Sequence, residues 1–433
     1  MKILWLTNIP LPEASVLMNE TPTPFGGWLV GSSLRLAEKE NIDLCVAFPH
    51  KSAKLFQMYQ GEKITYYAFK PIKDAQNKKN QDMFESLLQE VQPDLVHIHG
   101  TEYPHTLVMM NTCEKLGVKA VISIQGLVSV IAKHTTANLP WKVIYGHTLR
   151  NFLRRDSVAG LKKQFERRGR DEIAALKKAK HVIGRTEWDR ACTMQINPKA
   201  EYHFCNETLR DEFYKHQWNP ENIERYSIFL SQARSPIKGL HYAVEAMAEI
   251  VKSFPSAKMY VSGRNPIYWS SFKEKLIATF YSKYLKKMID RLGLTKNIIF
   301  TGSLSEKEMC QRYLKSHVFV CSSTIENSPN SLGEAMILGV PCVASYVGGI
   351  PDMLQHREEG FLYPVDAPYM LAHYVKKIFQ DDNLASRISL KAREKASQTH
   401  YKEDNMKKLL EIYERIRNYD DDLKTYRFEF RIY

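Results

Sequence analysis

Short apolar runs that alternate with helical patterns are the feature that most constrains how this chain folds. In the first half, strand-like runs lie at residues 2–7, 43–47, 95–99, 120–124 and 181–184. In the second half they lie at residues 227–231, 258–262, 298–301, 318–321 and 341–345. Helical patterns cover residues 28–39 and 81–90, and others begin at Gly239, Tyr284, Glu306 and Asn330. This alternation predicts an α/β chain with two Rossmann-like, doubly wound parallel sheets.

The length of 433 residues is enough for two domains with separate cores. We expect a first domain over residues 1–215, a second over 216–404, and a charged helix and tail over 405–433. In the tail, the alternation in TYRFEFRIY is typical of a strand, and a packed irregular tail fits it equally well.

Composition indicates a globular protein of a reducing compartment, at 44% hydrophobic and 25% charged residues. The seven cysteines are scattered without a CxxC pair, which favours reduced core thiols in a cytoplasm and argues against structural zinc. The apolar start MKILWLTNIP is too short for a signal peptide, and no run reaches about 18 apolar residues. The expectation is a cytoplasmic protein, soluble or peripheral on a membrane.

The net charge of +13 is concentrated in residues 150–180, where eleven Lys and Arg stand against four acids. This segment has helical spacing, and a basic amphipathic helix binds anionic lipid. A solvated helix face over the core explains the charge equally well. Nucleic acid is disfavoured, because no zinc-finger or RNP-like motif accompanies the charge.

Two glutamates separated by seven residues, Glu326 and Glu334, carry the strongest chemical signal. Glu326 follows a strand-like run, and Glu334 falls inside the next helix. We predict Ser328 as the N-cap and Pro329 as the first helical residue, with Gly339 after the end. Carboxylates that accept from hydroxyls suit the sugars of a sugar nucleotide. The free amides of that helix start suit its phosphates, and they belong to Asn330, Ser331 and Leu332.

This arrangement resembles the donor site of retaining GT-B glycosyltransferases, specifically the large family-four group. The family pattern of two glutamates, a helix, a GxPVVAS-like strand and a glycine pair reads here as Glu326, Glu334, GVPCVAS from Gly339, and Gly348-Gly349. The resemblance implies two domains that face each other across a cleft, with the acceptor side in the first and the donor side in the second. It also implies that the C-terminal helix packs back on the first domain.

A loop after the strand at 227–231 resembles the family segment whose Arg and Lys neutralise the donor diphosphate. Lys238 aligns with the family lysine, while the family arginine falls on Ala233 and Arg234 follows it. Gly263, after the next strand, resembles a family glycine and implies that the nucleotide approaches the backbone closely there. Arg264 beside it is a further candidate for a donor contact.

Four features of the first half complete the resemblance. Gly26 and Gly27 open a helix after the first strand, where the family loop faces the donor phosphates. His97 and His99 end a strand in a run like the family D-V-V-H-x-H, and a structural role suits each as well as a sugar contact. Gln125 stands where many members carry a histidine that touches the donor sugar, and His134 follows in the next loop.

Two polar segments, residues 184–190 and 206–210, follow strand ends in the first half. Thr186 is the expected helix cap in the first of them. In relatives such positions line the acceptor side or the domain junction; salt bridges within the fold are the other interpretation.

Together these residues predict a retaining, metal-independent glycosyltransferase that uses no cofactor. The donor is a UDP- or GDP-linked sugar, and the acceptor is a hydroxyl of a glycan or lipid-linked molecule in exopolysaccharide, capsule or O-antigen synthesis. Glu326, Lys238 and Arg234 are the expected catalytic residues. Alternatives are a sugar-nucleotide epimerase or a phosphorylase of the same fold, or a non-catalytic basic binding protein.

Overall fold

The chain groups into two compact units in a computed structural model that describes residues 1–22, 26–146, 148, 151, 156–232, 234–268 and 278–429, with side chains up to residue 418. The first unit contains residues 1–128, 168–208 and 400–433, and the second contains 129–167 and 209–399. The segment 129–167 therefore groups with the second half of the chain, although sequence reasoning assigned it to a first domain over 1–215.

The first unit is built on an eight-stranded sheet in the order β3-β4-β2-β1-β5-β6-β7-β8, parallel except for the antiparallel pair β3 and β4. Its strands are β1 (Lys2–Leu6), β2 (Asp43–Pro49), β3 (Phe56–Gln60), β4 (Ile64–Phe69), β5 (Leu95–His99), β6 (Lys119–Ser123), β7 (His181–Gly184) and β8 (Glu201–Phe204). Its helices are α1 (Pro12–Leu17), α2 (Gly27–Ala37), α3 (Lys78–Val91), α4 (Pro104–Leu116), α9 (Glu187–Ile196) and α18 (Lys402–Glu429). Two more helices, α5 (Val128–His134) and α8 (Val158–Lys178), cross the division between the units.

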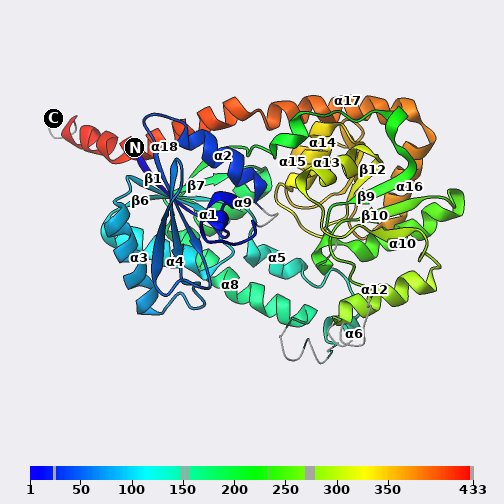
Figure 1. Cartoon of the computed structure of the whole chain (residues 1–433), viewed down its shortest axis with the longest axis horizontal. Helices are drawn as coiled ribbons and strands as arrows, with labels where there is room; N and C mark the ends of the chain where they lie inside the picture. Colours follow the sequence, from blue (N-terminus) through cyan, green and yellow to red (C-terminus); the bar gives the residue numbers. More distant parts are fainter. Residues whose placement is uncertain are drawn as a thin grey trace. The chain divides into compact units, whose positions relative to one another are not determined.

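Helices cover both faces of this sheet, with α3 and α4 on one face and α2 and α18 on the other (Figure 1). The C-terminal helix contributes to the core, because the fully buried Tyr413 accepts a hydrogen bond from Trp5 Nε1 at 3.0 Å. The strand-like alternation near the C-terminus does not form a strand in the described residues, since α18 continues to Glu429.

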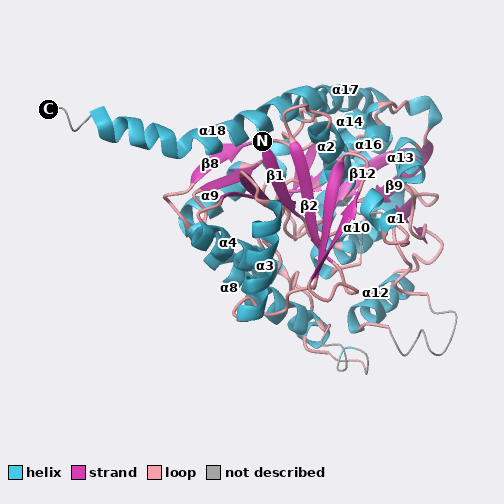
Figure 2. Cartoon of the chain, turned by 60° about the vertical axis from the view of Figure 1, so that its left-hand side comes forward, coloured by secondary structure: helices cyan, strands magenta, loops and turns pink. Residues whose placement is uncertain are grey.

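The second unit contains a fully parallel six-stranded sheet in the order β11-β10-β9-β12-β13-β14. Its strands are β9 (Glu224–Leu230), β10 (Lys258–Val261), β11 (Ile298–Phe300), β12 (Ser316–Cys321), β13 (Cys342–Ser345) and β14 (Gly360–Tyr363). Its helices are α6 (Trp141–Ile144), α10 (Leu240–Ser253), α12 (Phe280–Arg291), α13 (Glu306–Leu314), α14 (Asn330–Leu338), α15 (Ile350–Met353), α16 (Pro368–Gln380) and α17 (Asp382–Thr399), with short 3-10 turns η1 (Asp211–Tyr214), η2 (Pro220–Asn222) and η3 (Pro236–Lys238). Each sheet and its covering helices can be followed by colour in Figure 2.

Both sheets have a point where the strand order reverses, between β1 and β5 in the first and between β9 and β12 in the second. Crossovers leave these neighbouring strands toward opposite faces, so the loops at their carboxyl ends diverge and leave a crevice. The loops after β9 and β12 hold the predicted cationic and acidic residues, Lys238 and Glu326.

Two local predictions need correction. Ser328 is not the N-cap of α14: the helix begins at Asn330, Pro329 occupies the cap position, and the Ser328 hydroxyl lies 3.5 Å from Met353 Sδ instead. Of the basic segment 150–180, α8 covers Val158–Lys178, and residues 150 and 152–155 lie outside the described residues.

All seven cysteines carry free thiols, and six of them are buried, as expected for core residues. Along the described part of the chain, no helix has both the length and the apolar character to cross a bilayer.

Candidate functional site

An ion pair between Lys238 and Glu326 lies at the reversal point of the second sheet. Lys238 ends η3 in the loop that leaves β9, and Glu326 lies in the loop that leaves the neighbouring strand β12. The Lys238 ammonium donates to Glu326 Oε1 at 2.5 Å, and the Ser323 hydroxyl donates to the same oxygen at 2.7 Å. Two residues 88 positions apart therefore form one ion pair.

Two hydrogen bonds, one from a backbone amide and one from a side-chain hydroxyl, connect the two loops. The Thr324 amide donates to the Ile237 carbonyl at 2.7 Å, and the Ser322 hydroxyl donates to the Lys238 carbonyl at 3.0 Å. Such direct cross-links leave the Lys238–Glu326 pair on a rigid base, so the site is largely preorganised.

Glycines allow these loops to approach closely. Gly239 has φ +69°, and a Cβ there would lie 1.8 Å from the Ser322 carbonyl oxygen. Gly348 has φ +51°, and a Cβ there would lie 1.9 Å from the Glu326 carbonyl oxygen, which accepts from the Gly349 amide at 3.1 Å. The glycine pair quoted from the sequence is therefore a backbone support for the Glu326 loop.

The ion pair is mostly shielded from solvent, with 28% of the Lys238 side chain and 15% of the Glu326 side chain exposed. Burial disfavours the charge on Lys238, but the Glu326 carboxylate outweighs that effect and raises the pKa of the ammonium. Lys238 is accordingly a fixed cation across the physiological pH range.

Next to the pair is a hollow of about 470 Å³ that three cationic side chains line among the described residues: Arg234, Lys238 and Arg264. This size is within the range of small-molecule sites, about 300–1,000 Å³. Other lining residues include Gln232, Ser235, Asn265, Tyr268, Asp156 and Phe280. The concentration of positive charge suits an anionic ligand such as a diphosphate. Gly263 precedes Arg264 with φ +105°, and no atom lies within 4 Å of the position its Cβ would take.

Glu334 has a partner that the glutamate spacing did not indicate. Arg210 binds it in bidentate fashion, with Nε to Oε1 at 2.7 Å and Nη2 to Oε2 at 2.9 Å. Burial raises the pKa of the Glu334 carboxyl, and the Arg210 guanidinium opposes that rise. A carboxylate has about four lone-pair directions, so each oxygen keeps one for a ligand hydroxyl.

The start of α14 presents amide donors beside Glu334, in the same helix. Pro329 offers no side-chain cap, and the Leu332 amide already bonds to the Pro329 carbonyl at 2.9 Å. The amides of Asn330 and Ser331 belong to the first turn, where no intrahelical acceptor exists. Two of the three predicted amide donors therefore remain for a ligand.

Comparisons with known proteins agree with this geometry. Residues 211–395 match the model of the family "Glycosyl transferases group 1". The resemblance that the sequence motifs indicated is thereby confirmed for the part of the chain that holds Lys238, Glu326 and Glu334.

Proteins similar in sequence to this chain include enzymes named for sugar transfer. N-acetyl-alpha-D-glucosaminyl L-malate synthase of Bacillus anthracis is 25% identical over 202 residues, 47% of each chain. The putative colanic acid biosynthesis glycosyltransferase WcaL of Salmonella typhimurium is 26% identical over 163 residues, 37% of this chain and 38% of its own. The matched part thus spans about half or less of the length of these relatives.

The likeness to solved structures extends beyond residues 211–395. The solved structure of Anabaena HepE in complex with UDP matches with a TM-score of 0.65 at 17% identity, over 96% of this chain and 100% of that one. Two parallel-sheet α/β units with this likeness establish the GT-B fold that the sequence predicted.

In the first unit, the two predicted histidines differ in their surroundings. His97 lies within hydrogen-bond distance of Tyr413 Oη and Ser123 Oγ, each at 2.5 Å, so both of its ring nitrogens are used. His99 is 6% exposed, and neither of its ring nitrogens has a hydrogen-bond partner within the described structure. Burial lowers the pKa of His99 to about 3, which keeps the imidazole neutral.

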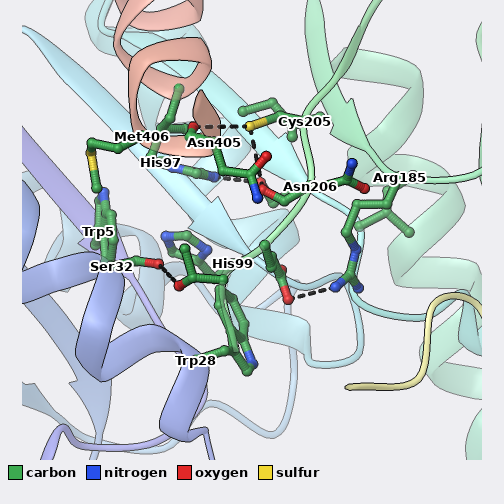
Figure 3. A pocket seen from close by; sticks show the side chains of 16 residues that line it. Trp5, Trp28, Ser32, His97, His99, Arg185, Cys205, Asn206, Asn405 and Met406 are labelled. Carbon is green, nitrogen blue, oxygen red and sulfur yellow. Dashed lines mark hydrogen bonds and ion pairs between the residues drawn. The ribbon is translucent and has the colours of Figure 1, made fainter. Parts of the chain in front are cut away.

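His99 borders a small pocket of about 40 Å³ between strand ends and α2 and α18 (Figure 3). Its ring lies against Trp5 at 4.4 Å and Trp28 at 5.6 Å between centroids, and Arg185 lies across the pocket. The pocket has room for only a few water molecules or a small substituent.

Gln125 belongs to a polar network at one side of that pocket. Its amide donates to Glu207 Oε1 at 2.5 Å, and Arg185 Nη1 binds Glu207 Oε2 at 2.5 Å. The polar segments 184–190 and 206–210 are therefore connected by an internal salt bridge, and Thr186 caps α9 by accepting from the Asp189 amide at 3.1 Å.

The remaining predicted residues are His134 and the glycines of α2. The carbonyl of the exposed His134 accepts from the Thr324 hydroxyl at 3.4 Å, which places it beside the Glu326 loop of its own unit. Gly26 occupies the N-cap of α2 at φ +75°, and Gly27 starts the helix without a side-chain cap. A Cβ at Gly26 would lie 2.5 Å from Ile9 Cδ1.

Sequence reasoning did not identify Ser323 as a ligand of Glu326 or Arg210 as the partner of Glu334. A signal for Arg210 existed, since it ends the polar run 206–210 just before the family-like domain. Nothing in the sequence connected it to Glu334, which lies 124 positions away.

Proposed function

We propose that this protein is a retaining, metal-independent glycosyltransferase that moves a sugar from a UDP- or GDP-linked donor to a hydroxyl of a glycan or lipid-linked acceptor. The observation that carries the proposal is the Lys238–Glu326 pair at the reversal point of a parallel sheet, beside a hollow lined by three cations.

Fixed positive charge would assist departure of the nucleoside diphosphate. As the bond between the anomeric carbon and the phosphate oxygen breaks, the diphosphate gains negative charge. Lys238, Arg234 and Arg264 line the space for that group, and preorganised cations stabilise developing charge without reorganisation. This chain's own cations would thus do the work assigned to a metal ion in other glycosyltransferases.

Glu326 would act on the sugar. Its Oε1 atom is held by Lys238 and Ser323, which leaves Oε2 to contact donor hydroxyls or the positive charge that develops at the anomeric carbon. The acceptor oxygen forms the new bond on the face that the diphosphate leaves, and its proton passes to the departing phosphate oxygen. Entry and departure on one face retain the anomeric configuration.

Glu334 and the start of α14 would hold the nucleotide. Arg210 fixes the Glu334 carboxylate, whose remaining lone pairs accept from ribose hydroxyls. The Asn330 and Ser331 amides would donate to phosphate oxygens.

The names of relatives support the substrate class. HepE has been solved in complex with UDP-glucose, and WcaL is named for colanic acid biosynthesis. We infer a role in the synthesis of a surface polysaccharide.

The direct test is nucleotide release from UDP-glucose, UDP-galactose, UDP-N-acetylglucosamine and GDP-mannose in the presence of EDTA, with glycerol as a simple hydroxyl acceptor. We expect one donor to release its nucleoside diphosphate and to yield an α-glycoside by proton NMR. Failure with every donor, dependence on added Mg²⁺, or a β-glycoside contradicts the corresponding part of the proposal.

We propose further that α8 holds the enzyme on an anionic membrane surface. Four of its exposed cations, which form no salt bridge within the described structure, recur at helical spacing: Lys163, Arg167, Arg170 and Lys177. At 100° per residue they lie within roughly 80° of one another and extend over roughly 21 Å, opposite the buried residues of the helix. Each basic residue near an anionic bilayer contributes about 1 kcal/mol of attraction.

Charge reversal of these four residues to glutamate is expected to abolish flotation with phosphatidylglycerol vesicles at low salt. The matched control reverses four exposed lysines elsewhere, Lys51, Lys54, Lys63 and Lys258, and so changes the net charge equally. If both variants lose binding to the same extent, net charge rather than α8 determines the association.

A further inference from the structure

Three side chains of the kinds that bind transition metals gather at one edge of the first sheet. His181 begins β7, while Glu201 and His203 lie on the edge strand β8. His181 pairs with Glu201 across the parallel strands, so these two side chains share a face of the sheet. Side chains two positions apart on a strand also share a face, which brings His203 to the same place.

The donor atoms have the spacing of a metal site. His181 Nδ1 lies 3.1 Å from His203 Nε2 and 3.5 Å from Glu201 Oε2, and one donor atom from each residue lies within 4.8 Å of the others. A tetrahedral Zn²⁺ ion with bonds of about 2.0–2.1 Å separates its ligand atoms by roughly 3.3 Å. We propose that His181, Glu201 and His203 form a binding site for Zn²⁺ or a similar divalent transition metal, separate from the glycosyltransferase chemistry.

Both imidazoles are in the protonation state that a metal requires. His181 is 3% and His203 8% exposed, and burial lowers the pKa of each to about 4. At neutral pH both rings are uncharged. Their mutual hydrogen bond needs one N–H between the two facing nitrogens. Metal binding therefore requires the imidazole that carries this N–H to change to its other tautomer. Solvent carries the proton from the facing nitrogen to the second nitrogen of the same ring, so no proton is released overall.

Cations around the cluster set the expected strength of binding. Arg415, on α18, holds Glu201 Oε1 at 2.5 Å, which orients the carboxylate and leaves Oε2 toward His181 (Figure 2 shows β8 beside α18). Lys180 acts electrostatically on His181, and Lys408 acts on His203. These positive charges weaken attraction for any dication. The nitrogen-rich ligand set favours Zn²⁺, Co²⁺ or Ni²⁺ over Ca²⁺ and Mg²⁺, which prefer oxygen.

A metal bound at this cluster would stabilise the edge strand β8. Among the described strands β8 pairs only with β7, and a metal bound to both strands would add a cross-link at that edge. A ligand that binds only the folded state raises the free energy of unfolding, and the increase grows with the ratio of ligand concentration to Kd. Metal should therefore raise the melting temperature of the whole chain while leaving donor turnover unchanged.

The test uses the full chain stripped with EDTA and then dialysed free of the chelator. Titration with Zn²⁺ in a calorimeter measures affinity and stoichiometry, and Co²⁺ gives visible absorption bands that report low coordination number. His203→Gln and Glu201→Gln remove a ligand while keeping a polar side chain of similar size. The control is His50→Gln. His50 Nε2 lies 3.1 Å from Glu20 Oε2, so this pair has a histidine and a carboxylate but lacks the second histidine of the proposed site.

We expect one saturable equivalent of Zn²⁺, at least tenfold weaker binding in both cluster variants, and no change in the control. Arg415→Gln should tighten binding, because it removes a competing cation and frees Glu201 Oε1. The proposal is overturned if the native chain shows no saturable Zn²⁺ binding and no Co²⁺ bands, or if His203→Gln and Glu201→Gln bind as the native chain does.

Discussion

Replacing Glu326 with glutamine is expected to lower kcat for sugar transfer by about 10²–10³-fold, the usual cost of removing one preorganised electrostatic contact to a transition state. Glutamine keeps the side-chain length and accepts from Ser323 through its amide oxygen. It lacks the negative charge that would stabilise the anomeric carbon. The affinity for UDP, measured by calorimetry, should change little, because the proposed nucleotide contacts lie on α14 and in the cationic hollow.

Lys238→Met tests the other half of the pair and should have a different signature. It removes a cation that faces the diphosphate, so nucleotide affinity and kcat should both fall. It also leaves the mostly buried Glu326 without its partner, and an uncompensated charge destabilises the fold. A double-mutant cycle with Glu326→Gln separates these effects, since part of the destabilisation should disappear when both charges are absent.

The chain offers a matched control for charge removal. Lys115 Nζ donates to Glu85 at 2.7 Å in the first unit, and the Glu85 side chain is 17% exposed, close to the 15% of Glu326. Glu85→Gln should leave turnover within about twofold of the native rate. Equal losses in Glu85→Gln and Glu326→Gln would mean that general destabilisation, and not the site, explains the result.

Most strands with buried faces were predicted from sequence, but the buried strands β4 and β14 were missed, as were the edge strands β3 and β8. The predicted runs 95–99 and 181–184 coincide with β5 and β7, whose residues are all buried. β3 is half exposed and antiparallel at the sheet edge, and β8 is a four-residue edge strand with the polar sequence EYHF. Without a continuous apolar run these edge strands have no local signal, because their pairing partners determine them.

The site shows the same limit at the level of side chains. Local motifs identified Lys238, Glu326 and Glu334, because each lies at a strand end or helix start with its own sequence signature. The partners of these side chains were not predictable, because the sheet order brings β9 next to β12 and tertiary packing brings η1 next to α14. Lys238 was assigned to the diphosphate and Glu326 to the sugar, yet the two are a single ion pair.

The second large effect is expected from Gly239→Ala, which should destabilise the fold and reduce turnover together. Gly239 has φ +69°, and an alanine there costs about 1–2 kcal/mol for the left-handed conformation alone. The new Cβ would also lie 1.8 Å from the Ser322 carbonyl oxygen. Overpacking adds about 1–3 kcal/mol, so the free energy of unfolding should fall by roughly 2–5 kcal/mol.

Gly293→Ala separates the two causes, because Gly293 has the same φ of +69° and no atom within 4 Å of the Cβ position. It should lose only the conformational term and keep full turnover. The clash at Gly239 can be relieved only if Ser322 moves, and Ser322 is followed directly by Ser323, whose hydroxyl holds Glu326. The variant should therefore lose turnover even at a temperature where urea titration shows it fully folded. Two variants with equal stability losses and equal activity would show that the closeness of the β9 and β12 loops does not position the ion pair.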